Sequence, residues 1–127
     1  MLDAGWGRVV NISSGLAANP ARMIRGNAYV TTKAALEAHT VNLAAELAGT
    51  GVTVNVYRPR MVDTAMEASI RGQDPERIGA GLHERFNKNY AEGILITPEH
   101  TAGVLLAHLA GNDTGAIWDV GASPAAA

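Results

Sequence analysis

A tyrosine and a lysine lie four residues apart where an alanine-rich segment begins. They are Tyr29 and Lys33, in the stretch GNAYVTTK at 26–33. If the segment is helical, the two side chains share one face, because residues four apart are neighbours on a helix. An ammonium group beside a phenol stabilises the phenolate, so such a tyrosine could exchange a proton with an alcohol or a carbonyl oxygen. By itself, this spacing is more often an exposed pair without a catalytic role.

A serine hydroxyl could act together with this pair. Ser14 follows a short β-branched run, RVVNIS at 8–13, which is typical of a buried strand. It precedes Tyr29 by fifteen residues and could hold a substrate oxygen beside the phenol. A serine after a strand is otherwise usually a turn or cap residue.

The elements that must position these residues alternate between strands and helices. The residue patterns predict three strands, at 8–13, 52–57 and 114–121. They also predict a long helix with a broad apolar face at about 27–47, and further helices around 64–71, from 75 toward 90 and from 98 onward. This alternation indicates an α/β fold with a parallel sheet, in which functional residues gather at the carboxyl ends of the strands. We expect this edge to carry Ser14 after the first strand, Tyr29 at the start of the long helix, and the segment 59–64 after the second strand.

The composition is that of a soluble globular domain. The chain has 127 residues, of which 47% are hydrophobic and 17% charged, and its length fits one domain. The net charge is -2 with acids and bases mixed, so nothing indicates a nucleic acid or an anionic membrane as a partner. There is no cysteine, no signal-peptide layout and no apolar run that approaches a membrane span. We therefore expect a soluble, cytoplasmic protein.

Four stretches, taken in order, carry a family resemblance. They are GRVVNISS at 7–14, NAYVTTKAAL at 27–36, GVTVNVYRPRMVDTAM at 51–66 and TGAIWDVG at 114–121. In this set the chain resembles the short-chain dehydrogenase/reductase family, and closely its 3-oxoacyl-carrier-protein-reductase-like branch. The resemblance covers nearly the whole chain. It implies that residues 1–127 are a single partial NAD(P)-binding domain, the C-terminal part of a Rossmann-type doubly wound parallel sheet with about three strands and flanking helices.

The resemblance also implies roles for individual residues. Tyr29 would be the general acid/base, which protonates a ketone oxygen in reduction or deprotonates a secondary alcohol in oxidation. Lys33 would stabilise the phenolate form of Tyr29 and hydrogen-bond the hydroxyls of the nicotinamide ribose. Ser14, rather than its neighbour Ser13, would orient the substrate oxygen. The cofactor would be NAD or NADP, which carries the hydride. The residues expected to contact it are Tyr29, Lys33, Pro59, Val62 and Thr64.

Two larger features follow from the same resemblance. The segment at about 65–95 corresponds to the variable substrate lid of the family, which would decide the small-molecule substrate. The small-residue face of the 27–47 helix resembles the surface by which these enzymes form homo-oligomers, a dimer or a tetramer. Packing of that face on the sheet would explain the same residues.

Two departures from the family pattern carry consequences. Arg60 stands where the family usually has glycine, and it would either perturb the nicotinamide pocket or reach a phosphate or an acidic substrate. The phosphate loop, the ribose-reading residue and the catalytic asparagine correspond to positions upstream of residue 1, and no Gly-x-x-x-Gly-x-Gly follows a strand here. We therefore expect the chain alone to bind dinucleotides weakly. The alternative to an active oxidoreductase is a catalytically silent fragment that acts only as an association partner.

The other ionisable residues are weaker candidates. The histidines lack paired metal-ligand spacing, so no metal site is expected at His39, His83, His100 or His108. The simplest interpretation of Glu37, Glu46 and Glu67 is that they are solvated charges on helix surfaces.

Overall fold

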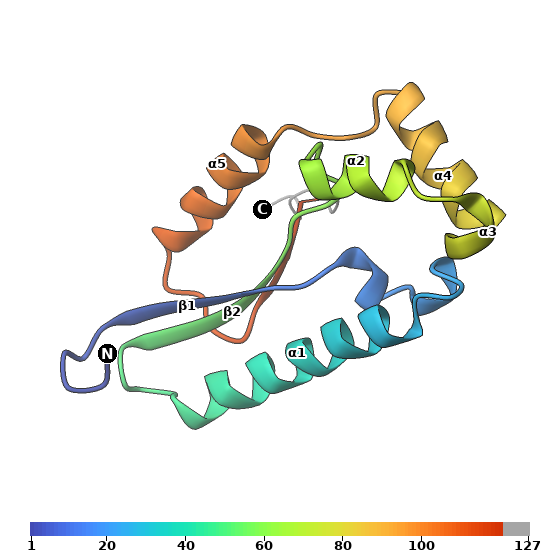
Figure 1. Cartoon of the computed structure of the whole chain (residues 1–127). Coiled ribbons are helices and arrows are strands. Elements are labelled where there is room, and N and C mark those ends of the chain that lie inside the picture. The colour runs from blue at the N-terminus through green and yellow to red at the C-terminus, as the bar shows by residue number, and fades with distance from the viewer. Residues whose placement is uncertain (121–127) are drawn as a thin grey trace.

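A three-stranded parallel sheet forms the centre of the protein. In the computed structural model, which describes residues 1–120, the strands are β1 (Gly7–Ile12), β2 (Val52–Arg58) and β3 (Ile117–Asp119), in the order β1-β2-β3 (Figure 1). Both strand pairs are parallel. The predicted α/β class is confirmed, although β3 starts later than residue 114 because Gly115, with a φ of 74°, cannot continue a strand.

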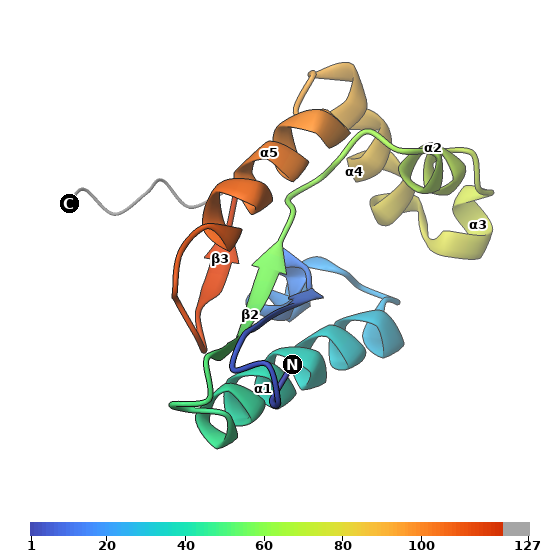
Figure 2. The same cartoon turned by 90° about the vertical axis from the view of Figure 1, so that its left-hand side faces the viewer.

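β2 is the most buried element because it lies between the other two strands. Its residues Val52–Tyr57 are all buried, and Val54 and Val56 are completely so. Such a run is typical of a parallel strand that is covered on both faces. α1 (Asn27–Glu46) lies on one side of the sheet and α5 (Pro98–Leu109) on the other (Figure 2). Within residues 1–120, no helix is long and apolar enough to cross a membrane.

Two hydrogen bonds in the interior fix these helices on the sheet. The Asn11 side-chain amide donates to the Thr40 hydroxyl oxygen over 2.9 Å, from β1 to α1. The Tyr57 hydroxyl donates to the Thr101 carbonyl oxygen over 2.6 Å, from β2 to α5. A buried polar group that loses its partner costs about 1–3 kcal/mol, so these bonds specify how each helix lies along its strand.

The apolar face predicted for α1 is only partly buried. The buried residues of the helix are Val30, Thr40 and Ala44. Ala34, Ala38 and Val41 are exposed, because a helix buries only the stripe that faces its sheet and these residues form a second stripe beside it. The second stripe and Ile117 line a groove of about 620 Å³. The prediction of one broad core face was therefore wrong in its extent.

Three helices stand beyond the carboxyl ends of the strands (Figure 1): α2 (Ala65–Arg71), α3 (Pro75–Ile78) and α4 (Ala80–Ala91). α2 begins where it was predicted, because the Thr64 hydroxyl oxygen caps it by accepting from the Glu67 amide over 3.3 Å. The prediction of a single helix from 75 toward 90 was wrong, because this range contains α3 and α4. The chain turns at Gly79, whose φ of 95° is incompatible with a helix.

Candidate active site

The residues predicted to act together lie at one end of the sheet. Ser14 directly follows β1, Tyr29 and Lys33 occupy the first two turns of α1, and Pro59 directly follows β2. Because β1 and β2 are parallel, their carboxyl ends share one edge, and α1 starts from it. The Lys33 ammonium group donates over 2.8 Å to the carbonyl oxygen of Ile12, the last residue of β1. That bond ties the first turns of α1 to the strand that Ser14 follows.

Tyr29 presents its phenol to solvent beside a positive charge. The residue is 40% exposed, and Lys33 Nζ lies 5.8 Å from the centroid of its ring. In the part of the chain that the structure describes, no residue hydrogen-bonds the Tyr29 hydroxyl. The phenol is therefore accessible to a small molecule.

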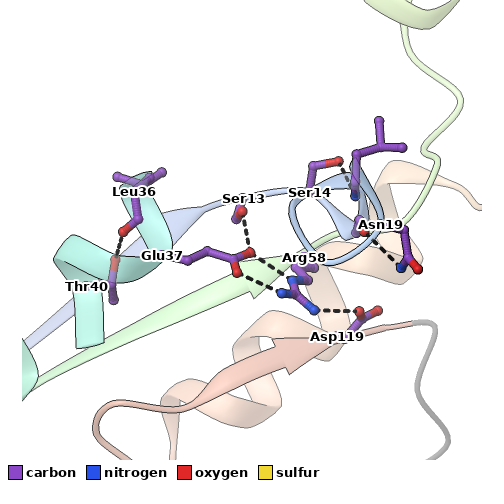
Figure 3. A network of polar contacts seen from close by, with 10 residues as sticks. Ser13, Ser14, Asn19, Leu36, Glu37, Thr40, Arg58 and Asp119 are labelled. Carbon is purple, nitrogen blue, oxygen red and sulfur yellow. Dashed lines mark hydrogen bonds and ion pairs between the residues drawn. The ribbon is translucent and has the colours of Figure 1, made fainter. Parts of the chain in front are cut away.

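The two adjacent serines have different environments. Ser14 is half-buried, and its hydroxyl oxygen accepts from the Leu16 amide over 3.2 Å in the first turn of the loop before α1. Its hydrogen has no acceptor among residues 1–120. Ser13 is buried and donates to Glu37 Oε1 over 2.6 Å (Figure 3). Ser14 can thus donate to a ligand, whereas Ser13 is committed to the interior.

Glu37 is the centre of a polar cluster behind the site (Figure 3). Arg58 donates from Nε to Glu37 Oε1 over 2.8 Å and from Nη2 to Glu37 Oε2 over 2.7 Å. Arg58 Nη1 also lies 3.5 Å from Asp119 Oδ2 on β3. The Glu37 side chain is only 12% exposed, so the prediction that it is a solvated charge was wrong. An arginine at the end of an otherwise uncharged strand was the signal in the sequence that could have indicated a buried acidic partner.

The cluster keeps both of its central groups charged. Burial by itself raises the pKa of Glu37, but the hydrogen bonds from Arg58 and Ser13 and the charge of Arg58 outweigh it, so that pKa lies below its ordinary value. The hydrogen bond to Glu37 raises the pKa of Arg58 despite burial. The ion pair is therefore complete at neutral pH.

Two other predictions about charged residues differ in outcome. Glu67 is 5% exposed and forms an ion pair with Arg71 one turn further along α2, so it is not a solvated charge. Glu46 is exposed, as predicted.

Within residues 1–120, no three His, Cys, Asp or Glu side chains are grouped as ligands for a metal.

The segment after β2 presents unpaired backbone groups. Val62 forms a parallel bridge with Ile96, in which the Asp63 amide donates to Ile96 over 2.9 Å and the Ile96 amide donates to Met61 over 3.0 Å. In such a bridge the N–H and C=O of the central residue face away from the partner. Neither group of Val62 is bonded among residues 1–120. Arg60, which is exposed, adopts a φ of 63°, the left-handed conformation that glycine favours.

Comparison with known proteins gives this arrangement a family context. The family model described as short chain dehydrogenase matches residues 1–75, which include Ser14, Tyr29, Lys33 and the segment 59–64. Acetoacetyl-CoA reductase from Cupriavidus necator is 42% identical over 82 residues, which are 65% of this chain and 32% of that protein. The 3-oxoacyl-acyl-carrier-protein reductase from Aquifex aeolicus is 33% identical over 108 residues, which are 84% of this chain and 39% of that protein.

A solved structure extends the likeness to the whole described fold. The crystal structure of actinorhodin polyketide ketoreductase with NADPH matches with a TM-score of 0.77 and 31% identity. The match covers 94% of this chain and 48% of that chain. The chain spans less than half the length of each of these three relatives. Its sequence, its fold and the family model agree, and the chain belongs to the short-chain dehydrogenase family, with relatives of the 3-oxoacyl-carrier-protein-reductase kind.

Proposed function

We propose that this chain is part of an NAD(P)-dependent oxidoreductase that interconverts a ketone and a secondary alcohol. One observation carries the proposal. The exposed phenol of Tyr29, with the Lys33 ammonium group beside it, lies at the start of α1, on the same sheet edge as the Ser14 hydroxyl, whose hydrogen is free to donate among residues 1–120. Membership of a dehydrogenase family and likeness to a ketoreductase favour this function over a catalytically silent association partner.

Tyr29 is the general acid/base in this proposal. In reduction its hydroxyl gives a proton to the substrate carbonyl oxygen, and in oxidation the phenolate takes the proton of the alcohol. The Lys33 charge, 5.8 Å from the ring centroid, stabilises the phenolate that remains after the proton has left. The proton moves to oxygen while the carbonyl carbon is reduced, so the product is a neutral alcohol.

Ser14 positions the substrate oxygen. Its own oxygen already accepts from the Leu16 amide, which orients the hydroxyl and leaves the hydrogen to donate to a carbonyl. Ser13 is unsuited to this role because its hydroxyl is buried and donates to Glu37.

The residues at this edge fit the nicotinamide end of a dinucleotide. A carboxamide has one acceptor and one donor group, and the unpaired N–H and C=O of Val62 complement both. Lys33 has two N–H groups besides the one on Ile12, which can reach ribose hydroxyls. Pro59 and Thr64 flank Val62 in the same segment. When bound, NAD or NADP carries the hydride.

Tyr29→Phe tests the proposed function because it removes the proton donor and keeps the ring. In the protein that carries this chain, ketone-dependent oxidation of NADPH or NADH should fall by about 100-fold or more, while the Kd for the dinucleotide changes little. Thr31→Ala is the matched control, since the Thr31 hydroxyl on the same helix is exposed and, within the described part of the chain, bonds only to Asn27. Undiminished turnover in Tyr29→Phe would contradict the assignment.

We also propose that α1 pairs with α1 of a second copy. Ala34, Ala38 and Val41 form an exposed stripe, and Ile117 beside it is 43% exposed. An apolar surface of this kind is typical of an association site. Ala38→Arg should shift the protein toward monomer in sedimentation velocity, and a native chain that is already monomeric would contradict the pairing.

A further inference from the structure

Three arginine side chains converge where the loop before α1 meets the helices beyond the sheet. Arg22 and Arg25 lie in that loop, and Arg85 lies on α4. Arg85 donates through Nη1 to the carbonyl oxygen of Arg22, and Arg25 Nη1 donates over 3.3 Å to the carbonyl oxygen of Glu76. Figure 1 shows the loop, in light blue, beside α3 at the right of the molecule. The two segments are therefore joined by arginine side chains.

These side chains line one pocket of about 530 Å³. The other residues of its wall are Ile24, Ile78, Gly79, Ala80, Gly81 and Leu82. Among residues 1–120, no acidic side chain lines it. The volume is in the range of small-molecule sites, which is about 300–1,000 Å³. The pocket thus combines an apolar wall with three positive charges.

The guanidinium groups in this pocket have no carboxylate partner. None of the three forms an ion pair with an Asp or Glu side chain within residues 1–120. Burial, followed by the like charge of Arg22, holds the pKa of Arg85 below its usual value. Arg85 is half-buried, whereas Arg22 and Arg25 are exposed. Their like charges repel one another, so an anion that enters the pocket would relieve the repulsion.

Arg25 is held at the pocket at an energetic cost. Its φ of 69° lies in the left-handed region, which is sterically unfavourable for an L-residue with a side chain. Gly79 gives its side chain room, because a Cβ at that position would lie 3.3 Å from Arg25 Cδ. A glycine at position 25 would avoid the strain, and residues held in this way cluster at ligand-binding positions.

We propose that Arg22, Arg25 and Arg85 form an oxyanion subsite that binds the carboxylate or phosphate group of the substrate. Guanidinium groups recognise both anions through pairs of parallel hydrogen bonds, and the apolar wall contacts a short carbon chain. Arg25 precedes Tyr29 by four residues, so their Cα atoms are at most about 15 Å apart, and the subsite borders the start of α1, where Tyr29 lies. The substrate is then an oxo acid or a phosphorylated ketone.

Calorimetric titration of the 127-residue chain at fixed ionic strength tests the subsite. The probes are 4-oxopentanoate, its neutral methyl ester and inorganic phosphate. The acid should bind at least about tenfold more tightly than the ester, because a charged hydrogen bond contributes about 1.5–3 kcal/mol. Phosphate should compete with the acid, and the tighter of the two anions identifies the oxyanion class. Equal affinity for acid and ester would overturn the proposal.

Arginine variants locate the binding. Arg85→Gln and Arg25→Gln should each weaken 4-oxopentanoate binding about tenfold, whereas Arg85→Lys should restore part of the affinity by returning the charge. The matched control is Arg77→Gln, an exposed arginine on α3 that does not line the pocket. An equal loss in Arg77→Gln would overturn the assignment. Circular dichroism checks that each variant is folded.

The inference rests on the proposed oxidoreductase function only where it identifies the anion as substrate. Anion binding is measured without turnover, so the two proposals can fail separately. Binding that depends on Arg85, in a protein that reduces no ketone, supports the subsite and contradicts the proposed function. Ketone reduction without any preference for an anionic substrate over its ester supports the function and overturns the subsite.

Discussion

Arg58 and Glu37 form a two-point ion pair that joins the end of β2 to α1. Arg58 Nε lies 2.8 Å from Glu37 Oε1, and Arg58 Nη2 lies 2.7 Å from Glu37 Oε2. The two side chains are only 13% and 12% exposed, and Ser13 adds a hydrogen bond to the same carboxylate from the end of β1. Glu37 follows Lys33 by one helical turn, so the pair holds the helix face that carries the proposed site.

Breaking this ion pair should destabilise the fold. Arg58→Met leaves the Glu37 carboxylate largely buried without its partner, so we expect the free energy of unfolding to fall by about 2–4 kcal/mol. Replacing both residues, as Glu37→Leu with Arg58→Met, should cost less than the sum of the single changes because no unpaired charge remains. Urea denaturation followed by circular dichroism measures each value.

A surface ion pair in the same chain is the control for this effect. Lys88 and Glu92 are 3.9 Å apart, with side chains that are 65% and 51% exposed. Lys88→Met should change the free energy of unfolding by less than about 0.5 kcal/mol. Equal losses in Arg58→Met and Lys88→Met would show that the buried position of the first pair is unimportant.

The decrease in the free energy of unfolding at acidic pH should depend on Glu37. Its pKa in the folded protein is depressed, so its contribution is complete above the pKa of the unfolded chain and is lost as pH falls through the lower, folded value. The free energy of unfolding should therefore decrease below about pH 4.3, the ordinary value for glutamate. Glu37→Gln should show a shallower decrease in urea titrations across that range. Parallel profiles of the two proteins would contradict this linkage.

Alanine substitution of the two adjacent serines should affect different quantities, activity at Ser14 and stability at Ser13. Ser14→Ala removes the hydroxyl that we assign to the substrate oxygen, so kcat/KM for ketone reduction should fall by about 100-fold. Ser13→Ala removes a buried hydrogen bond to Glu37, so the free energy of unfolding should fall by about 1–2 kcal/mol with little change in kcat/KM. Steady-state kinetics and urea denaturation separate the two effects. A larger kinetic loss in Ser13→Ala would reverse the assignment.

Arg60→Gly should stabilise the protein slightly. The left-handed φ of 63° costs arginine about 1–2 kcal/mol, whereas glycine loses about 0.5–1 kcal/mol of additional backbone entropy on folding. The expected net gain in the free energy of unfolding is up to about 1 kcal/mol. Arg77→Gly, in a helix, is the control and should destabilise by about 1 kcal/mol. Thermal unfolding of both variants is the measurement, and a loss of stability in Arg60→Gly would show that its side chain makes a compensating contact.

Local sequence patterns were sufficient to predict most elements of the fold. The β-branched runs at 8–13 and 52–57 are strands within one residue, because such runs pack well only in a covered sheet. The helix break at Gly79 was missed, because a single glycine is tolerated inside helices and only its φ in the folded chain distinguishes a break. The extent of burial on α1 was also missed, because the sheet covers one stripe of the helix and the sequence contains two.

The sequence by itself determined the family, the α/β class and the sheet edge on which Ser14, Tyr29 and Lys33 lie. These follow from ordered motifs and from the rule that parallel strands end at one edge. Only the tertiary structure decided the partners of Glu37 and the charge environment of the arginine pocket. Glu37 and Arg58 are 21 residues apart, and Arg22 and Arg85 are 63 residues apart. Whether a charged side chain is solvated or buried depends on contacts between residues that are far apart in the sequence, and local sequence patterns do not predict such contacts.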